Sequence, residues 1–153
     1  MREILFRGKA NSEARDGEWV YGSLLAESAN TFPIIARDYD NDEDWISVIE
    51  WDTVAPETVG QFTGLTDTNG NRIFEGDILE SRISENPEDW KIWTVGFEDG
   101  TFTFESVRKS VKSRRKYRHE LNMICVDEVK FYGLVLVGNI HDNPELLEGN
   151  EDG

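Results

Sequence analysis

Apolar and polar residues alternate with a period of two along most of this chain, and this alternation constrains the fold more than any other feature. Residues 45–49, 76–83 and 90–97 are examples, and Gly, Asn or Asp interrupts the runs at short intervals. The pattern is typical of half-buried strands. Asp99-Gly100, between two such runs, predicts a tight hairpin, because a type I′ turn needs positive φ at both central residues. Many short strands and little helix favour an all-β fold with SH3-like barrel character.

The order of the runs predicts one all-β unit over residues 1–148, followed by a frayed acidic tail at 149–153. Within the unit we expect additional N-terminal strands at 1–57 to pack as a subdomain on a barrel formed by 58–141. The apolar run 131–137 is interpreted as a central strand, because both of its faces are apolar. Asn143 followed by Pro144 predicts a capped, short helical turn near the C-terminus.

The charge of the chain is strongly negative and unevenly distributed. Lys and Arg number 16 against 31 Asp and Glu, which gives a net charge of −15 and argues against a general affinity for nucleic-acid backbones. Seven of the basic residues nevertheless fall in the acid-free segment 108–118, called here the basic segment: Arg108, Lys109, Lys112, Arg114, Arg115, Lys116 and Arg118. Three interpretations stay open, namely a solvated loop, an arm that contacts a protein partner or a second copy, and a nucleic-acid contact.

Aromatic residues beside the basic segment bear on the nucleic-acid interpretation. An exposed Trp90 or Tyr117 would provide a stacking surface for single-stranded nucleic acid, whereas the alternative for Trp90 is a rim residue that covers the end of the barrel. The alternating runs around Trp19, Trp45 and Trp93 predict that these three side chains belong to the core or the barrel wall.

Residue patterns for metal binding and catalysis are incomplete. Residues 38–44 place carboxylates at alternate positions, as in a calcium-binding loop. Such a loop needs Gly at its sixth position and a bidentate Glu at its twelfth, and this chain has Glu43 and Ile49 there. This stretch is therefore interpreted as an acidic, solvated hairpin loop. His119 and His141 with the single Cys125 cannot form a structural zinc set. We expect no metal, no cofactor and no catalytic residue, and hence a protein that is not an enzyme.

The single cysteine and the N-terminal residues indicate in which cellular compartment the protein is expected. Cys125 cannot form an internal disulfide, and its apolar neighbours favour a buried thiol. No apolar run approaches the length that spans a membrane, and the N-terminus enters a strand-like segment without a secretory signal. These features predict a protein of the cytoplasm.

Three stretches together resemble the YopX-like family of phage and prophage proteins. They are residues 2–9 with 17–22, residues 59–67 continuing through Asn69-Gly70 to 73–78, and residues 137–147. The resemblance spans almost the whole chain except 106–130. It implies an origin in a phage or prophage of bacteria and an all-β fold with SH3-type character. It implies no catalytic residue and no established molecular function.

The resulting functional hypothesis is a non-enzymatic phage accessory protein that acts as an interaction module in the cytoplasm of the bacterial host. Its partner would be a host or phage protein or a second copy of the chain, and not a membrane. Two alternatives are nucleic-acid binding through residues 108–118 and mimicry of DNA by the acidic body of the chain.

Overall fold

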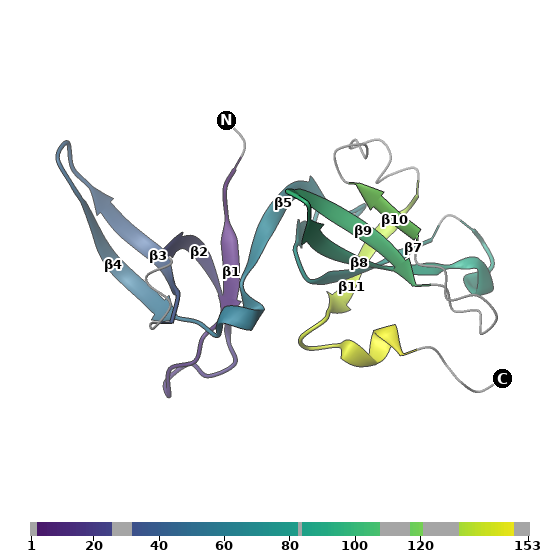
Figure 1. Ribbon diagram of the computed structural model, residues 1–153, viewed down its shortest axis with the longest axis horizontal. Helices are drawn as coiled ribbons and strands as arrows, with labels where there is room; N and C mark the ends of the chain where they lie inside the picture. Colours follow the sequence, from purple (N-terminus) through teal and green to yellow (C-terminus); the bar gives the residue numbers. More distant parts are fainter. Residues whose placement is uncertain (1–2, 26–31, 83, 108–116, 121–131, 149–153) are drawn as a thin grey trace. The chain divides into compact units, whose positions relative to one another are not determined.

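The computed structural model describes residues 3–25, 32–82, 84–107, 117–120 and 132–148 of the 153-residue chain. For Val107 and for residues 117–120 the backbone alone is described. The described elements are strands joined by turns and three short 3₁₀ helices, so the predicted all-β class is confirmed (Figure 1). The SH3-like detail stays a prediction.

The chain divides into two compact units, residues 1–62 and 63–153. The boundary lies inside β5 (Gly60–Thr66), whereas the sequence predicts a division after residue 57. The expected packing of one part on the other stays a prediction.

The first unit is an antiparallel sheet built from short strands. Its elements are β1 (Phe6–Lys9), β2 (Trp19–Leu25), β3 (Ile34–Asn41), β4 (Ile46–Thr53), the 3₁₀ helix η1 (Pro56–Thr58) and the start of β5 (Gly60–Thr66). The strand order is β4-β3-β2-β1-β5-β6, which leaves β4 at one edge. Ala10, Val20, Ile35 and Val54 form the buried core, at one end of the β3–β4 hairpin. The remainder of this hairpin extends beyond the core, as Figure 1 shows.

The second unit contains a five-stranded antiparallel sheet in the order β10-β9-β8-β7-β11. Its elements are β6 (Arg72–Phe74), β7 (Asp77–Ser81), η2 (Pro87–Asp89), β8 (Lys91–Glu98), β9 (Thr101–Val107), β10 (Tyr117–Glu120), β11 (Leu134–Asn139) and η4 (Pro144–Leu147). Its core consists of Ile73, Leu79, Trp93, Val95, Phe104 and Leu134. Ile78 and Leu79 of β7 and Ile92 and Trp93 of β8 are all buried, so these strands are covered on both faces, more deeply than the half-buried strands that the sequence predicts.

Two turns have the predicted geometry. Asp99 and Gly100 have φ values of 52° and 78°, so both central residues of the β8–β9 hairpin adopt the positive φ that a type I′ turn needs. Gly70, with φ of 84°, closes the turn between β5 and β6. An L side chain is disfavoured at such angles, which explains glycine at both places.

Two predictions about the C-terminal part are wrong. Among the strands that the structure describes, β11 ends the sheet instead of lying in its centre, and β7 is its strand neighbour. The side chain of Asn143 does not cap η4, and its Oδ1 atom accepts a hydrogen bond from the Asn139 N–H at 3.3 Å. The short helical turn itself, with Pro144 in its first positions, is confirmed.

Candidate functional site

The basic segment lies largely outside the described residues. This holds for Arg108, Lys109, Lys112, Arg114, Arg115 and Lys116. Tyr117 and Arg118 belong to β10, where their backbones pair with Ser106 and Glu105 of β9. A contact role for this segment therefore stays a prediction.

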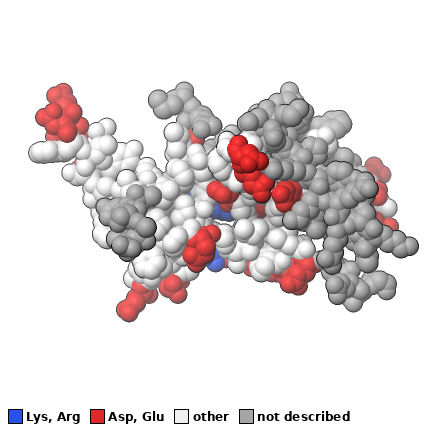
Figure 2. Space-filling view, in the orientation of Figure 1, with Lys and Arg blue, Asp and Glu red and all other residues white. Residues whose placement is uncertain are grey.

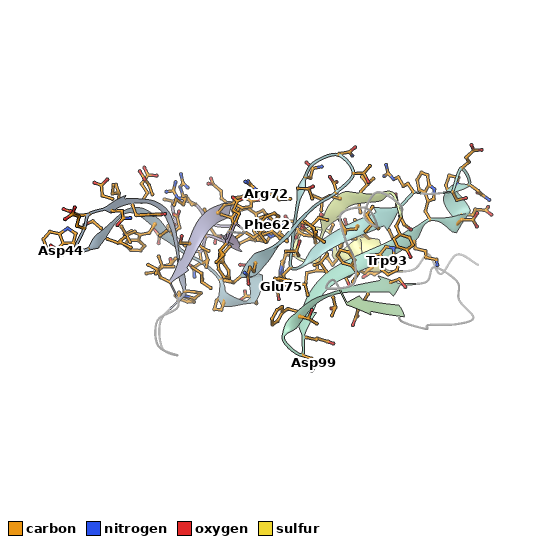
Figure 3. All side chains as sticks on the ribbon, turned by 90° about the horizontal axis from the view of Figure 1, so that it is seen from above. Asp44, Phe62, Arg72, Glu75, Trp93 and Asp99 are labelled. Atoms are coloured by element: carbon orange, nitrogen blue, oxygen red, sulfur yellow. The ribbon has the colours of Figure 1, made fainter. Side chains whose placement is uncertain are left out.

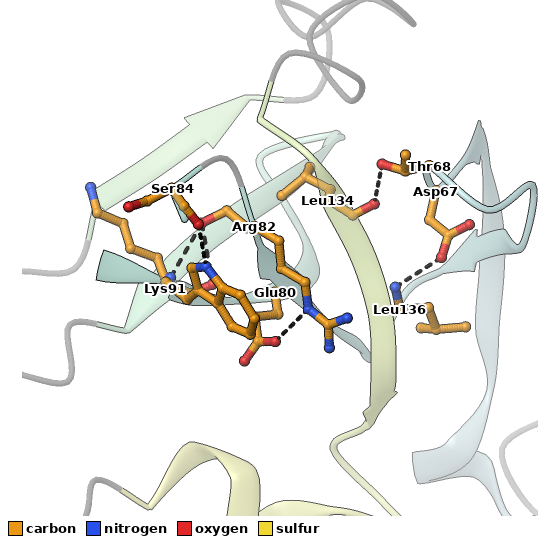
Figure 4. Close-up of polar contacts among 10 residues, drawn as sticks. Asp67, Thr68, Glu80, Arg82, Ser84, Lys91, Leu134 and Leu136 are labelled. Carbon is orange, nitrogen blue, oxygen red and sulfur yellow. Dashed lines mark hydrogen bonds and ion pairs between the residues drawn. The ribbon is translucent and has the colours of Figure 1, made fainter. Parts of the chain in front are cut away.

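Trp90 is held in place by two neighbouring residues. It follows η2, and its indole N–H donates a hydrogen bond of 2.8 Å to the carbonyl oxygen of Ser84. The guanidinium carbon of Arg82 lies 5.1 Å from the ring centroid, and the Arg82 Nε atom lies 2.8 Å from Glu80 Oε1 (Figure 4). Trp90 is half-buried. The Arg82 guanidinium therefore occupies one face of the Trp90 ring, and both interpretations of Trp90 stay predictions.

Asp67 forms a hydrogen bond to the backbone of β11 on the side of this strand that faces away from β7. The carboxylate is 5% exposed and accepts hydrogen bonds from the backbone N–H groups of Asn69, Asn71 and Leu136, at 2.9, 2.7 and 2.9 Å. The side-chain amide of Asn71 donates a fourth bond at 3.1 Å. Beside it, the Thr68 N–H and hydroxyl both donate to the Leu134 carbonyl oxygen (Figure 4). These bonds satisfy backbone groups of β11 that would otherwise face outward from the sheet.

Burial and hydrogen bonding act in opposite directions on the pKa of Asp67. Burial raises it, because removal from water disfavours the charged form. The hydrogen bonds from Leu136, Asn71 and Asn69 stabilise the carboxylate more strongly, so the net result is a pKa below the ordinary value. Asp67 is thus a charged structural group in the fold, and its place in the family motif has a structural explanation.

The β3–β4 hairpin carries an exposed apolar surface, which we call the apolar arm. Every residue from 38 to 51 is exposed. Six large apolar side chains form the arm, and their exposed fractions are 49% for Tyr39, 70% for Trp45, 65% for Ile46, 38% for Val48, 53% for Ile49 and 52% for Trp51. The side chains project from both faces of the ribbon, and Asp44 lies at its far end (Figure 3). The prediction that Trp45 belongs to the core is therefore wrong.

The alternation of residues 45–49 predicts a half-buried strand, with Trp45 in the core or the barrel wall. The same pattern also fits a strand that is buried by another chain. A signal for the second interpretation was present in the acids beside the run, at Asp42, Glu43 and Asp44. These acids make the turn of the hairpin, and Figure 2 shows the acidic side chains gathered at its tip.

The base of the apolar arm carries balanced charges. The Arg37 Nε atom lies 2.6 Å from Asp52 Oδ2, and its Nη1 atom lies 3.2 Å from Glu50 Oε2. Arg15 approaches the same Asp52 carboxylate at 3.8 Å. Two cations therefore face two anions at the base, whereas residues 38–44 at the tip contain five acids and no base.

No group of three or more His, Cys, Asp or Glu side chains within the described ranges is arranged to hold a metal ion. In the same part of the chain, none of the helices has the length and apolar character needed to span a bilayer.

These observations define the class of the protein as an all-β protein of two strand-built units with an exposed apolar hairpin. The YopX protein family matches residues 6–148, and the chain belongs to this family. Among solved structures, the crystal structure of protein EF1440 from Enterococcus faecalis is similar, with a TM-score of 0.61 and 28% sequence identity. The match covers 97% of this chain and 100% of that chain. None of the curated proteins matches this chain at a significant level.

Proposed function

We propose that this member of the YopX family is a non-enzymatic interaction module that binds another protein chain through its apolar arm. The observation that carries the proposal is the exposure of two tryptophans and three aliphatic side chains on one hairpin. A phage or prophage origin and action in the cytoplasm of a bacterial host, as the family resemblance implies, belong to the same proposal.

The size of the apolar arm supports this function. At about 200 Å² for a large apolar side chain, the exposed fractions of its six members amount to about 650 Å². These side chains lie on both faces of the ribbon, and their total compares with about 300–600 Å² for the largest apolar patch on a typical monomer, a patch that is often functional. Contact with another chain would remove this surface from water, at about 25 cal/mol for each Å². Aromatic residues are also the type most enriched at the centres of protein interfaces.

Nucleic-acid binding and DNA mimicry are less well supported. The stacking role that the sequence analysis considered for Trp90 requires an accessible ring face, and the Arg82 guanidinium occupies one of the two faces. Mimicry of DNA rests on the net charge of −15 alone. The apolar arm, by contrast, is a defined surface in the described structure.

The proposal is tested with two matched Ile→Glu variants. Ile46 and Ile4 are 65% and 59% exposed, so neither substitution removes a core side chain, and only Ile46 belongs to the apolar arm. Tagged wild-type chain, Ile46→Glu and Ile4→Glu are each mixed with host extract and with untagged chain, and bound proteins are identified by mass spectrometry. We expect wild type and Ile4→Glu to retain the same chain or chains and Ile46→Glu to lose them. Identical retention by all three, or none, would overturn the proposal.

A further inference from the structure

We infer that the partner of the apolar arm is a second copy of this chain, and that the two β4 strands pair antiparallel about a two-fold axis at Val48. This inference rests on the proposed function and specifies its partner. The pairing would join two six-stranded sheets into one, edge to edge.

The backbone of β4 offers the necessary hydrogen-bonding groups. β4 is an edge strand, so one side of its backbone lacks a neighbouring strand in the described sheet. The hairpin closes with the Asp42 N–H donating to the Trp45 carbonyl at 2.9 Å, and Asn41 then lies opposite Ile46 and Tyr39 opposite Val48. Because hydrogen-bonded and non-hydrogen-bonded pairs alternate along an antiparallel ladder, Ile46 and Val48 fall in non-hydrogen-bonded pairs. Their N–H and C=O groups therefore point away from β3, toward the free edge.

Residues 45–51 match their own reverse at the two ends and the centre, whereas Ile46 corresponds to Glu50 and Ser47 to Ile49. The seven residues Trp45-Ile46-Ser47-Val48-Ile49-Glu50-Trp51 have a tryptophan at each end. In an antiparallel pair centred on Val48, Trp45 of each copy lies opposite Trp51 of the other, and Val48 lies opposite itself. A two-fold interface requires such self-complementarity, since each residue meets its counterpart twice. Cross-strand aromatic pairs are also among the stabilising pairs in sheets.

The charges of the apolar arm favour the antiparallel direction. A parallel arrangement would bring together the two acidic tips, each with five acids in residues 38–44. The antiparallel arrangement places each tip beside the base of the other arm, where Arg15 and Arg37 lie. The two acidic tips are thereby separated, and Asp44 comes opposite Asp52 of the second copy, the carboxylate that Arg15 and Arg37 approach.

The exposed apolar area sets an upper limit on the interface. The apolar arm exposes about 650 Å² of apolar side chain per copy, so two copies expose about 1,300 Å². Edge-to-edge pairing buries the part of this area that borders the β4 edge, and a specific interface needs about 1,000 Å² in total with the paired backbone included.

Two measurements test the inference. Sedimentation equilibrium of the full chain is expected to give twice the 17.6 kDa mass of one copy, and to give a single-copy mass for Val48→Pro. Proline at residue 48 removes an N–H that faces the free edge, and so leaves the ladder with β3 in place. Circular dichroism checks that this variant retains its strands.

The second measurement is site-specific cross-linking, which does not depend on the folding of the proline variant. In a Cys125→Ser background, Val48→Cys is expected to form a disulfide-linked dimer under mild oxidation. Opposed residues of a hydrogen-bonded pair have Cα atoms about 5.5 Å apart, within the range of about 4.4–6.8 Å for a disulfide. Ile46→Cys is the matched control and is expected to stay unlinked, because Glu50 of the second copy lies opposite it.

The outcomes separate this inference from the proposed function. A single-copy mass at all concentrations, or cross-linking at residue 46 instead of 48, would overturn the two-fold pairing. If the arm then still retains a different protein in an Ile46-dependent manner, the proposed function stands and the partner is another chain. If the wild type is a single copy and nothing is retained, both are overturned.

Discussion

Replacement of Asp67 by Asn tests whether one buried carboxylate secures the edge of β11. The Asn side chain is nearly isosteric but has one acceptor oxygen and one donor NH₂ group. If its oxygen keeps the bonds to Asn69 and Asn71, its NH₂ group faces the Leu136 N–H and the Asn71 side-chain amide, which donate to Oδ2 in the wild type. Two donors then lose their acceptor. At about 1–3 kcal/mol for each buried donor left unpaired, we expect a loss of about 3 kcal/mol in the free energy of unfolding.

Urea unfolding followed by tryptophan fluorescence measures this loss, with Asp44→Asn as the control. Asp44 is exposed at the tip of the apolar arm, so its substitution is expected to change the free energy of unfolding by less than about 0.5 kcal/mol. The pKa of Asp67 is lowered by folding, so its contribution to stability is present above the pKa of the unfolded chain and is lost as the pH falls through the folded pKa. The difference between wild type and Asp67→Asn should therefore shrink in acid. Equal urea midpoints at pH 7 would refute this account of β11.

Three further predictions concern other parts of the chain. Gly100→Ala is expected to cost about 1 kcal/mol in urea unfolding because φ is 78° there, and an unchanged midpoint would contradict the turn assignment. Trp90→Phe removes the hydrogen bond to Ser84, and a loss of about 1 kcal/mol is expected, with Phe97→Leu as an exposed aromatic control. If the basic segment binds nucleic acid, fluorescence anisotropy at about 50 mM salt should detect binding that falls steeply with salt and disappears on replacement of residues 114–116 by Ala. No binding by the wild type at that salt would reject this alternative.

Local signals predicted the parts of the fold that short-range physics determines. The Asp99-Gly100 pair predicted its turn because positive φ is a property of two consecutive residues. Pro144 predicted a helical turn because its ring fixes φ at a helix start. The prediction that Asn143 caps the turn was wrong, since its side chain accepts a hydrogen bond from Asn139 instead. Several backbone N–H groups lie near such a side chain, and the packing of the folded chain determines which of them it bonds.

Features that depend on distant residues could not be predicted in the same way. The outer side of β11 is bonded by the carboxylate of Asp67, which lies 69 residues before Leu136 in the sequence. A turn is predicted by residues 67–71. The sequence of this stretch does not show which distant strand its side chains bond. Trp45 illustrates a second limit. Apolar periodicity indicates that a side chain avoids water, and it does not indicate whether its own chain or another one covers it.

Hydrogen exchange at the backbone amides of Ile46 and Val48 tests the central claim most directly. NMR would follow these two amides in the chain at low concentration and in the assembly that it forms, with itself or with a retained protein. The account predicts rapid exchange in the isolated chain and exchange at least about tenfold slower in the assembly, because formation of a backbone hydrogen bond protects an amide. An assembly in which both amides exchange as fast as in the isolated chain would contradict it.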